Sequence, residues 1–202
     1  MKIGVLALQG AFIEHQQIVE SLGAAVRQVR LPDDLEGLDG LIIPGGESTT
    51  IGKLATDFGL IEPLRQFGRQ HAIWGTCAGA IFLSKDIHRD QPLLGLMDIT
   101  VERNAFGSQV ESFEIDLDIP CLNRPEWFKP EWLKEGLKSA PFHAVFIRAP
   151  LIESVNGSTE VLATLPDRRI VAARQGKWLA TSFHPELTSD HRFHRYFLEM
   201  SQ

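Results

Sequence analysis

The stretch Ala72-Ile73-Trp74-Gly75-Thr76-Cys77-Ala78-Gly79-Ala80-Ile81-Phe82-Leu83 decides the fold. Its first residues form an apolar run typical of a strand buried on both faces of a parallel sheet, and its last residues continue as a helix. A cysteine with flanking glycines between such a strand and such a helix is typical of a nucleophile elbow, a sharp turn that lifts the reactive side chain above the sheet. An isolated cysteine at a turn is more often structural, but this strand and these glycines favour a nucleophile. The helix N-terminus also favours the thiolate form of Cys77.

Strand and helix patterns alternate through the first half of the chain. The predicted strands are 3–8, 25–31, 41–43 and 72–74. Helical spacing separates them, with one helix ending at Gly23 and a helical region over about 49–70 that breaks near Gly59. This alternation predicts βαβ units with right-handed crossovers, and hence a three-layer α/β fold with a mostly parallel, doubly wound, flavodoxin-like sheet.

The second half of the chain has a different sequence pattern. Short strands with tight turns are predicted at 99–102, 142–147, 160–165, 170–174 and 177–182. We expect these to add antiparallel strands to the main sheet, and the stretch 190–200 to form a closing helix. The proline-rich stretch 120–141, which carries Trp127 and Trp132, is predicted to be a surface insertion in a single domain over 1–202.

The composition and charge of the chain exclude several classes of function. The chain has 202 residues and a net charge of −6, so it carries no basic footprint for nucleic acid. Its apolar runs are shorter than the roughly 18 residues that a membrane helix needs. Cys77 and Cys121 are the only cysteines, too few for a disulfide framework, so we expect a reducing, cytoplasmic location.

The triplet His184-Pro185-Glu186 is a second chemical signal. It follows an apolar run at 178–181, so it is predicted to lie at a strand end. Residues two apart on an extended chain face the same way, which lets Glu186 orient the His184 imidazole, while Pro185 keeps His184 out of a helix. Cys77, His184 and Glu186 are therefore the candidate catalytic triad. A zinc deaminase also uses an HxE triplet, but the PCxxC that it needs is absent.

The remaining histidines lack a comparable context. Each is expected to be a surface or a satisfied core residue: His15, His71, His88, His143, His191 and His194.

A glycine loop lies between the third predicted strand and its helix. Pro44-Gly45-Gly46-Glu47-Ser48-Thr49-Thr50 can present successive backbone N–H groups to an anion or a developing oxyanion. Ser48 or Thr49 can also simply cap the helix, and no GK[ST] follows, so the loop is not a Walker motif. Ligands bind at the carboxyl ends of parallel strands, which is where this loop and Cys77 are both predicted to lie.

Together these motifs resemble the class I glutamine amidotransferases, whose triad is Cys, His and Glu on an α/β sheet. Within that superfamily the chain is similar to the glutaminase subunits of pyridoxal 5′-phosphate synthase. The segments that carry this similarity are 6–12 with Glu14-His15, 44–50, 103–107 and 142–150. Ser108-Gln109 stands where the family pattern has Arg-Gln.

The resemblance implies a role for each matching residue. Cys77 would attack the side-chain amide of L-glutamine and release ammonia, with His184 as acid and base and Glu186 holding its imidazole. The residues implied in glutamine binding are Gly46, Glu47, Ser48, Arg103, Ile147 and Arg148. Gln9 and Gly10 would help complete the oxyanion hole where the partner docks.

The resemblance also implies a partner subunit and a pathway for the ammonia. The partner would be the synthase subunit, which makes pyridoxal 5′-phosphate from ribose 5-phosphate and glyceraldehyde 3-phosphate, in a large hetero-oligomer. The glutaminase itself would need no cofactor and no metal. Two alternatives stay open: a glutaminase that serves another pathway, such as imidazole glycerol phosphate synthase, and a stand-alone cysteine hydrolase of related fold.

Overall fold

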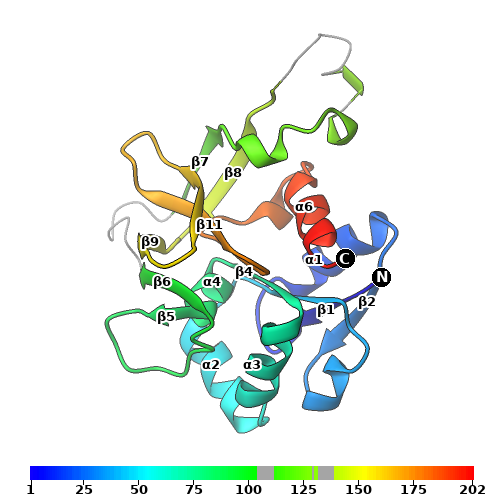
Figure 1. The fold of residues 1–202 in the computed structure, drawn as a ribbon, viewed down its shortest axis with the longest axis vertical. Coiled ribbons are helices and arrows are strands. Elements are labelled where there is room, and N and C mark those ends of the chain that lie inside the picture. The colour runs from blue at the N-terminus through cyan, green and yellow to red at the C-terminus, as the bar shows by residue number, and fades with distance from the viewer. Residues whose placement is uncertain (104–111, 129, 132–138) are drawn as a thin grey trace.

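The structure is a computed structural model that describes residues 1–103, 112–128, 130–131 and 139–202 (Figure 1). Its strands are β1 (Lys2–Leu6), β2 (Ala25–Val29), β3 (Gly40–Ile43), β4 (Ala72–Thr76), β5 (Ser84–Asp86), β6 (Met97–Glu102), β7 (Ser112–Leu117), β8 (Phe142–Ile147), β9 (Leu151–Val155), β10 (Glu160–Thr164), β11 (Ile170–Gln175) and β12 (Trp178–Thr181). Its α-helices are α1 (Phe12–Ser21), α2 (Ser48–Asp57), α3 (Ile61–Gln70), α4 (Ala78–Leu83) and α6 (Arg192–Met200). Short 3₁₀ turns are η1 (Pro32–Leu35), η2 (Pro120–Leu122), η3 (Pro125–Trp127) and η4 (Pro185–Leu187).

The main sheet confirms the α/β prediction. Its strand order is β2-β1-β3-β4-β12-β11-β9-β6-β5, and β10 also pairs with β11. The strands from β2 to β12 are parallel, and β11 then begins a run of antiparallel pairs. The last predicted strand, at 177–182, is therefore the fifth strand of the parallel part and not only an antiparallel addition.

Helices cover both faces of this sheet. The side chains of β3 alternate, so that Leu41 and Ile43 pack into one core with α2, α3 and α4, while Ile42 packs into the other with α1 and α6. Figure 1 shows α1 and α6 together on one side and α2 and α3 on the other. Burial on both faces explains the nearly continuous apolar runs of the parallel strands.

Helix boundaries follow local chain chemistry. Gly23 and Gly59 adopt φ of +87° and +65°, a region that glycine enters without steric cost. These residues follow α1 and α2, so the break that the sequence predicted near Gly59 separates α2 from α3. The start of α2 is fixed by Glu47, whose carboxylate accepts hydrogen bonds from the backbone N–H groups of Thr49 and Thr50.

Three strands were not predicted from the sequence: β5, β7 and β9. β7 alternates exposed acidic residues with half-buried Phe113 and Ile115, and it pairs with β8 as a separate antiparallel ribbon. Figure 1 shows β7 and β8 side by side, and the buried side chains of β8 pack into the core on the α6 side of the main sheet.

The stretch 120–141, predicted to be a surface insertion, is described only in part. In its described part, Leu122, Phe128 and Ala140 are buried, so the segment contributes to the core on the α6 side. Arg124 forms an ion pair with Glu199 of α6. Trp132 lies outside the described residues.

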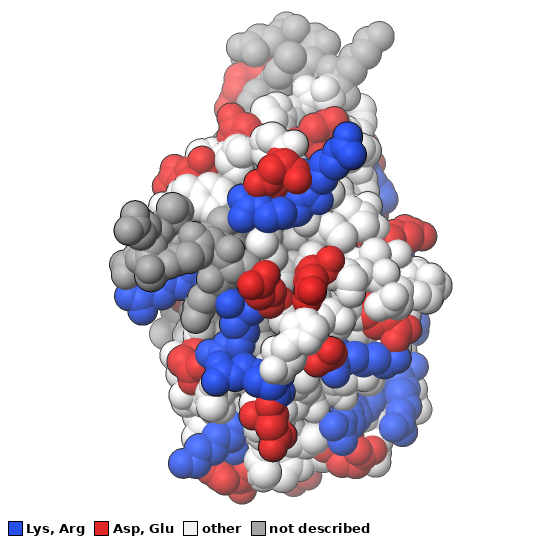
Figure 2. All heavy atoms as spheres, turned by 90° about the vertical axis from the view of Figure 1, so that its left-hand side faces the viewer, with Lys and Arg blue, Asp and Glu red and all other residues white. Residues whose placement is uncertain are grey.

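The outer surface carries mixed charge. On the face shown in Figure 2, basic and acidic groups are interspersed and do not form a field of one sign. Among the described helices, none combines the length and the apolar character that crossing a membrane requires.

Candidate active site

Four neighbouring parallel strands bring the predicted catalytic residues to one edge of the sheet. β1, β3, β4 and β12 are consecutive in the strand order, so their carboxyl ends lie side by side. The loops that leave these ends carry Gln9, Gly45, Cys77 and His184 respectively. A ligand placed at this edge can therefore contact loops that are distant in sequence.

Cys77 occupies the predicted elbow. Its backbone has φ of 47° and ψ of −107°, an unusual conformation for a residue with a side chain. The flanking glycines make the turn possible, because a Cβ at Gly75 would lie 2.4 Å from the carbonyl oxygen of Gly79, and one at Gly79 would lie 2.0 Å from that of Ile43. The Cys77 N–H donates to the carbonyl of Thr181 in β12 at 2.8 Å, which ties the elbow to the neighbouring strand.

His184 and Glu186, the other two residues of the candidate triad, are hydrogen-bonded to each other. Nδ1 of His184 lies 2.7 Å from Oε1 of Glu186, whose side chain is fully buried. A Cβ at Gly45 would lie 2.5 Å from Cε1 of His184 and 3.3 Å from Cβ of Cys77, so the imidazole and the cysteine meet over this glycine. The three residues that the sequence singled out thus come together.

The electrostatics of the triad favour a charged imidazole. Burial by itself disfavours the cation, but hydrogen bonds and the negative charges of Cys77 and Glu186 raise the pKa of His184 to about 10. Burial also opposes ionisation of Glu186, but His15 and His184 beside it hold the pKa of its carboxyl below the ordinary value. The arrangement therefore favours an imidazolium at His184 that is backed by the Glu186 carboxylate.

The glycine loop is held by its own acidic residue. Glu47 is partly desolvated, yet hydrogen bonds from Thr50 and Thr49 lower its pKa to about 2, so it is ionised at neutral pH. Its Oε1 accepts from Nη2 of Arg103 at 3.1 Å, and Nη1 of Arg103 donates to Thr49 Oγ1 at 3.2 Å. The hydroxyl of Ser48 is buried and makes no hydrogen bond to the described residues, so it is available to a ligand.

Gln9 and Gly10 contact the glycine loop directly. Oε1 of Gln9 accepts from the backbone N–H of Glu47 at 2.7 Å. Gly10 has φ of +100°, and a Cβ there would lie 1.8 Å from the carbonyl oxygen of Gly45, so no other residue fits. That carbonyl also accepts from the N–H of Ala11 at 3.1 Å. The loops after β1 and β3 therefore form one hydrogen-bonded unit.

Ile147 and Arg148 lie at the end of β8, and Ile147 approaches Cys77. The carbonyl oxygen of Ile147 is 4.0 Å from Sγ of Cys77. Arg148 has φ of 44°, so the chain turns sharply there. Ser108 and the rest of the segment 104–111 lie outside the described residues.

Three buried polar residues next to the triad were missed by the sequence analysis. His15 of α1 lies with Nε2 3.4 Å from Oε2 of Glu186 and 3.3 Å from Oγ1 of Thr76. Its Nδ1 is 2.9 Å from Nε2 of His194 in α6. The Glu14-His15 pair belonged to the recognised segments, but no local pattern connects His15 with residues about 170 positions away along the chain.

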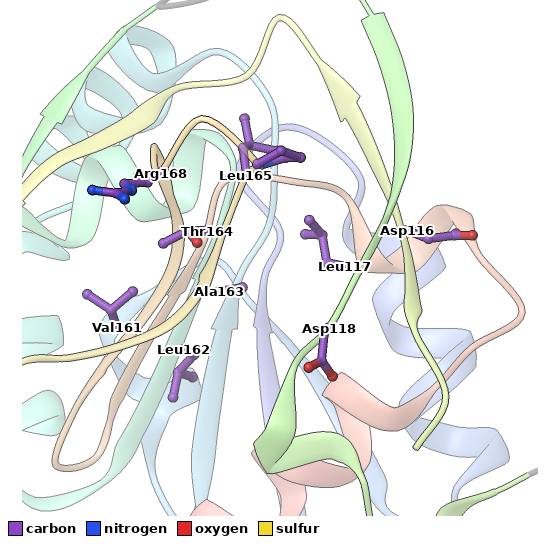
Figure 3. A pocket seen from close by; sticks show the side chains of 10 residues that line it. Asp116, Leu117, Asp118, Val161, Leu162, Ala163, Thr164, Leu165 and Arg168 are labelled. Carbon is purple, nitrogen blue, oxygen red and sulfur yellow. The ribbon is translucent and has the colours of Figure 1, made fainter. Parts of the chain in front are cut away.

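A cavity of about 510 Å³ lies elsewhere, between the end of β7 and strand β10 with its following turn. Figure 3 shows Asp116, Asp118 and Arg168 among its lining side chains. None of the candidate catalytic or glutamine-binding residues lines it. Within the part of the chain that the structure describes, no cluster of three or more His, Cys, Asp or Glu residues is arranged to hold a metal ion.

Comparison with known proteins agrees with this geometry. Residues 5–202 match the model of the SNO glutamine amidotransferase family. The chain belongs to this family. Its relatives include a protein of Herpetosiphon aurantiacus that is 57% identical over 98% of this chain and 99% of its own length. Another, from Deinococcus radiodurans, is 53% identical over 100% of this chain and 97% of its own length. Both are named pyridoxal 5′-phosphate synthase subunit PdxT.

Solved structures place this member of the family in its wider fold group. A crystal structure of a glutamine amidotransferase superposes with a TM-score of 0.85 at 50% identity, covering 98% of each chain. A structure of PurLQS from Thermotoga maritima gives a TM-score of 0.68 at 16% identity, over 100% of this chain and 99% of that one, which shows a shared fold.

Proposed function

We propose that this chain is the glutaminase subunit of pyridoxal 5′-phosphate synthase: it hydrolyses L-glutamine to L-glutamate and ammonia and passes the ammonia to the synthase subunit. The observation that carries the chemistry is the meeting of Cys77, on its strained elbow, with the hydrogen-bonded pair His184 and Glu186. The names of the full-length relatives support the pathway over imidazole glycerol phosphate synthesis or a stand-alone hydrolase.

The first half of the reaction forms a thioester. The Cys77 thiolate attacks the side-chain carbonyl carbon of glutamine, and the carbonyl π electrons move to oxygen to give a tetrahedral oxyanion. When the oxyanion collapses, the C–N bond breaks and the His184 imidazolium gives its proton to the leaving nitrogen, which departs as ammonia. Glu186 keeps the imidazole oriented, because its Oε1 holds Nδ1 and leaves Nε2 for the proton transfer.

The second half restores the enzyme. His184, now neutral, takes a proton from water, and the resulting hydroxide adds to the thioester carbonyl. Collapse of this second oxyanion breaks the C–S bond, releases glutamate and returns the thiolate and imidazolium pair. Both oxyanions form above the helix N-terminus of α4, close to the glycine loop that includes Gly46.

Glutamine binding is assigned to the loop after β3 and the end of β8. The buried Ser48 hydroxyl, Gly46 and Glu47 belong to the loop whose Gly45 lies against Cys77 and His184, and Arg103 is held at this loop by its ion pair with Glu47. A guanidinium suits the α-carboxylate of glutamine because it offers a bidentate fork. Ile147 and Arg148 complete the opposite wall.

The hydrogen bond between Gln9 and Glu47 offers a route by which the synthase subunit can control glutamine hydrolysis. A synthase subunit that contacts the loop after β1 also acts on the glycine loop through this hydrogen bond. An oxyanion donor contributes about 10²–10³ in rate, so a small rearrangement here is enough to switch turnover on. We assign the chain to the cytoplasm, where its two cysteines stay free thiols.

The test is steady-state release of glutamate and ammonia by the purified chain, titrated with the synthase subunit. We expect little activity from the chain alone and a synthase-induced rise in kcat that exceeds any fall in KM. Gln9→Ala should reduce this activation. A second titration with the synthase subunit of imidazole glycerol phosphate synthase serves as control and should have no effect. Equal activation by both partners, or full activity of the chain alone, would refute the pathway assignment.

A further inference from the structure

The carboxylate of the triad has a second neighbour that the reaction described above does not use. Glu186 Oε1 bonds His184, whereas Oε2 is buried and makes no hydrogen bond to the described residues. A buried carboxylate oxygen without a donor is costly. Nε2 of His15 lies 3.4 Å from Oε2, within ion-pair distance, and 3.3 Å from Oγ1 of Thr76.

His15 is in turn fixed from behind by His194. Both side chains are fully buried, at 0% exposure, and Nδ1 of His15 lies 2.9 Å from Nε2 of His194. His15 also packs edge-on against Trp74, with ring centroids 5.6 Å apart. The imidazole that faces Glu186 is thus clamped between α6 and strand β4 and has little freedom to turn.

The charge state of this pair follows from its burial. Burial lowers the pKa of His15, against the opposing effect of Glu186, and burial together with His15 and His191 lowers the pKa of His194 well below its ordinary value. Both rings are therefore neutral at pH 7, and each carries one N–H. Of the two nitrogens at the 2.9 Å contact, one must then donate and the other accept.

The carboxylate decides which tautomer is present. Ionised Glu186 can only accept, and the Thr76 hydroxyl, 3.3 Å from the same nitrogen of His15, can accept as well, so a proton on this nitrogen serves both neighbours and makes His15 the Nε2–H tautomer. Nδ1 of His15 then accepts from Nε2–H of His194, and Nδ1 of His194 has a lone pair, consistent with its having no hydrogen-bond partner among the described residues. The N–H of His194 thus points to His15, and the N–H of His15 points toward Glu186.

We propose that His15 is a positioning residue for the glutaminase reaction: its Nε2–H orients and keeps ionised the Glu186 carboxylate, and His194 selects the tautomer that allows this. The inference rests on the proposed function only for its kinetic readout. Without His15, Glu186 would be free to rotate and easier to protonate, and the His184 imidazolium would lose part of its support.

Two substitutions of nearly equal size distinguish the effect of the Nε2–H donor of His15 from the effect of its packing. The amide nitrogen of His15→Gln can occupy the place of Nε2, whereas that of His15→Asn reaches only the place of Nδ1. We expect His15→Asn to lower kcat/KM in the synthase complex by about 10- to 100-fold, as for the loss of a hydrogen bond to a charged group, and His15→Gln to retain most of it. The acid limb of the pH profile should move to higher pH in His15→Asn alone.

Phe193→Leu is the matched control. Phe193 is fully buried and stacks on Trp74 in the same core, but it has no recorded contact with Glu186 or His15. It should lower the melting temperature without moving the acid limb. If both His15 variants match the wild type, or if both lose activity equally with an unmoved acid limb, the proposal is wrong.

A measurement on the unaltered chain keeps this proposal separate from the proposed function. Long-range ¹H–¹⁵N spectra report which imidazole nitrogen is protonated, and we expect Nε2–H for both His15 and His194. A protonated Nδ1 in His15 would overturn the positioning role, even if glutamine hydrolysis were fully established. Correct tautomers in a chain that does not hydrolyse glutamine would instead refute the proposed function.

Discussion

Cys77 is held in a conformation that only its surroundings make stable. Its positive φ is maintained by the hydrogen bond to Thr181 and by the two glycines that let the backbones approach. Strain of this kind, on the order of 1–3 kcal/mol, aims the side chain and does not depend on the sulfur atom. The backbone and the nucleophile are therefore separable by mutation.

Cys77→Ala should abolish glutamine hydrolysis, by at least about 10³-fold, because the covalent intermediate cannot form. The melting temperature should change little, since alanine can occupy the same turn. Glutamate release in the synthase complex and thermal unfolding measure the two effects. Cys121→Ala is the control, because Cys121 lies in η2 beside Arg124 and Tyr196, and burial raises the pKa of its thiol. An equally deep kinetic defect in Cys121→Ala would contradict the assignment.

Gly79→Ala tests the close approach that the elbow needs. The added Cβ would lie 2.0 Å from the Ile43 carbonyl oxygen, so backbone must move, at a cost of about 1–3 kcal/mol. We expect lower stability in urea unfolding together with a loss of glutaminase activity, since the turn that carries Cys77 is displaced.

Gly23→Ala provides the comparison. Gly23 has φ of +87° but open space around its Cβ position, so it should lose about 1 kcal/mol and keep full activity. Activity loss in Gly23→Ala would show that general destabilisation, and not the elbow, explains the result for Gly79→Ala.

At the scale of single elements, the start of α2 links helix stability to the glutamine-binding loop. Glu47 caps the helix through Thr49 and Thr50 and also bonds Arg103, so one carboxylate fixes both the loop and the guanidinium. Any change in its ionisation therefore affects both.

Glu47→Gln should lower the free energy of unfolding at pH 7 by about 0.5–1 kcal/mol, because a neutral amide is a weaker cap. The folded-state pKa of Glu47, about 2, lies below its ordinary value, so the stabilisation is present above about pH 4.5 and is lost as the pH falls toward 2. Urea unfolding of both proteins between pH 2 and 7 should show the difference shrinking over that range. A difference that stays constant with pH would rule out the carboxylate as its source.

Elements whose pattern lies within one continuous segment could be predicted from the sequence. Elements that depend on pairing between distant segments could not. Gly75-Thr76-Cys77-Ala78-Gly79 gave the elbow because strand, turn and helix are contiguous in sequence. β7 was missed since its exposed side chains are one serine and two acids, and its strand state depends on pairing with β8. His15 was missed for the same reason: only the packing of α1 and α6 brings it to Glu186.

At the scale of the whole molecule, one buried arginine joins the C-terminal helix to the stretch before β8. Arg192 is 2% exposed; it forms hydrogen bonds to Asp190 and donates to the carbonyl oxygens of Ala140 and Pro141. The end of the segment 120–141 is thereby bonded to the start of α6.

Arg192→Met should destabilise the protein by about 3–5 kcal/mol, since two carbonyl groups lose their guanidinium donor and the Asp190 carboxylate keeps only the backbone N–H of residue 192. Arg124→Met is the control, because its ion pair with Glu199 is half exposed and worth at most about 1 kcal/mol. Equilibrium unfolding in urea compares them. Equal losses for the two variants would contradict the role given to Arg192.

The position of β12 in the sheet has a consequence for synthesis on the ribosome. β12 pairs with β4 although Trp74 and Thr181 are 107 residues apart, so the nascent chain completes the elbow long before its partner strand emerges. During that interval β4 is an open strand edge, a template on which other chains can pair. Cys77 is likewise synthesised well before His184, the base that the reaction needs. We therefore expect a chain interrupted before His184 to aggregate readily and to release no ammonia.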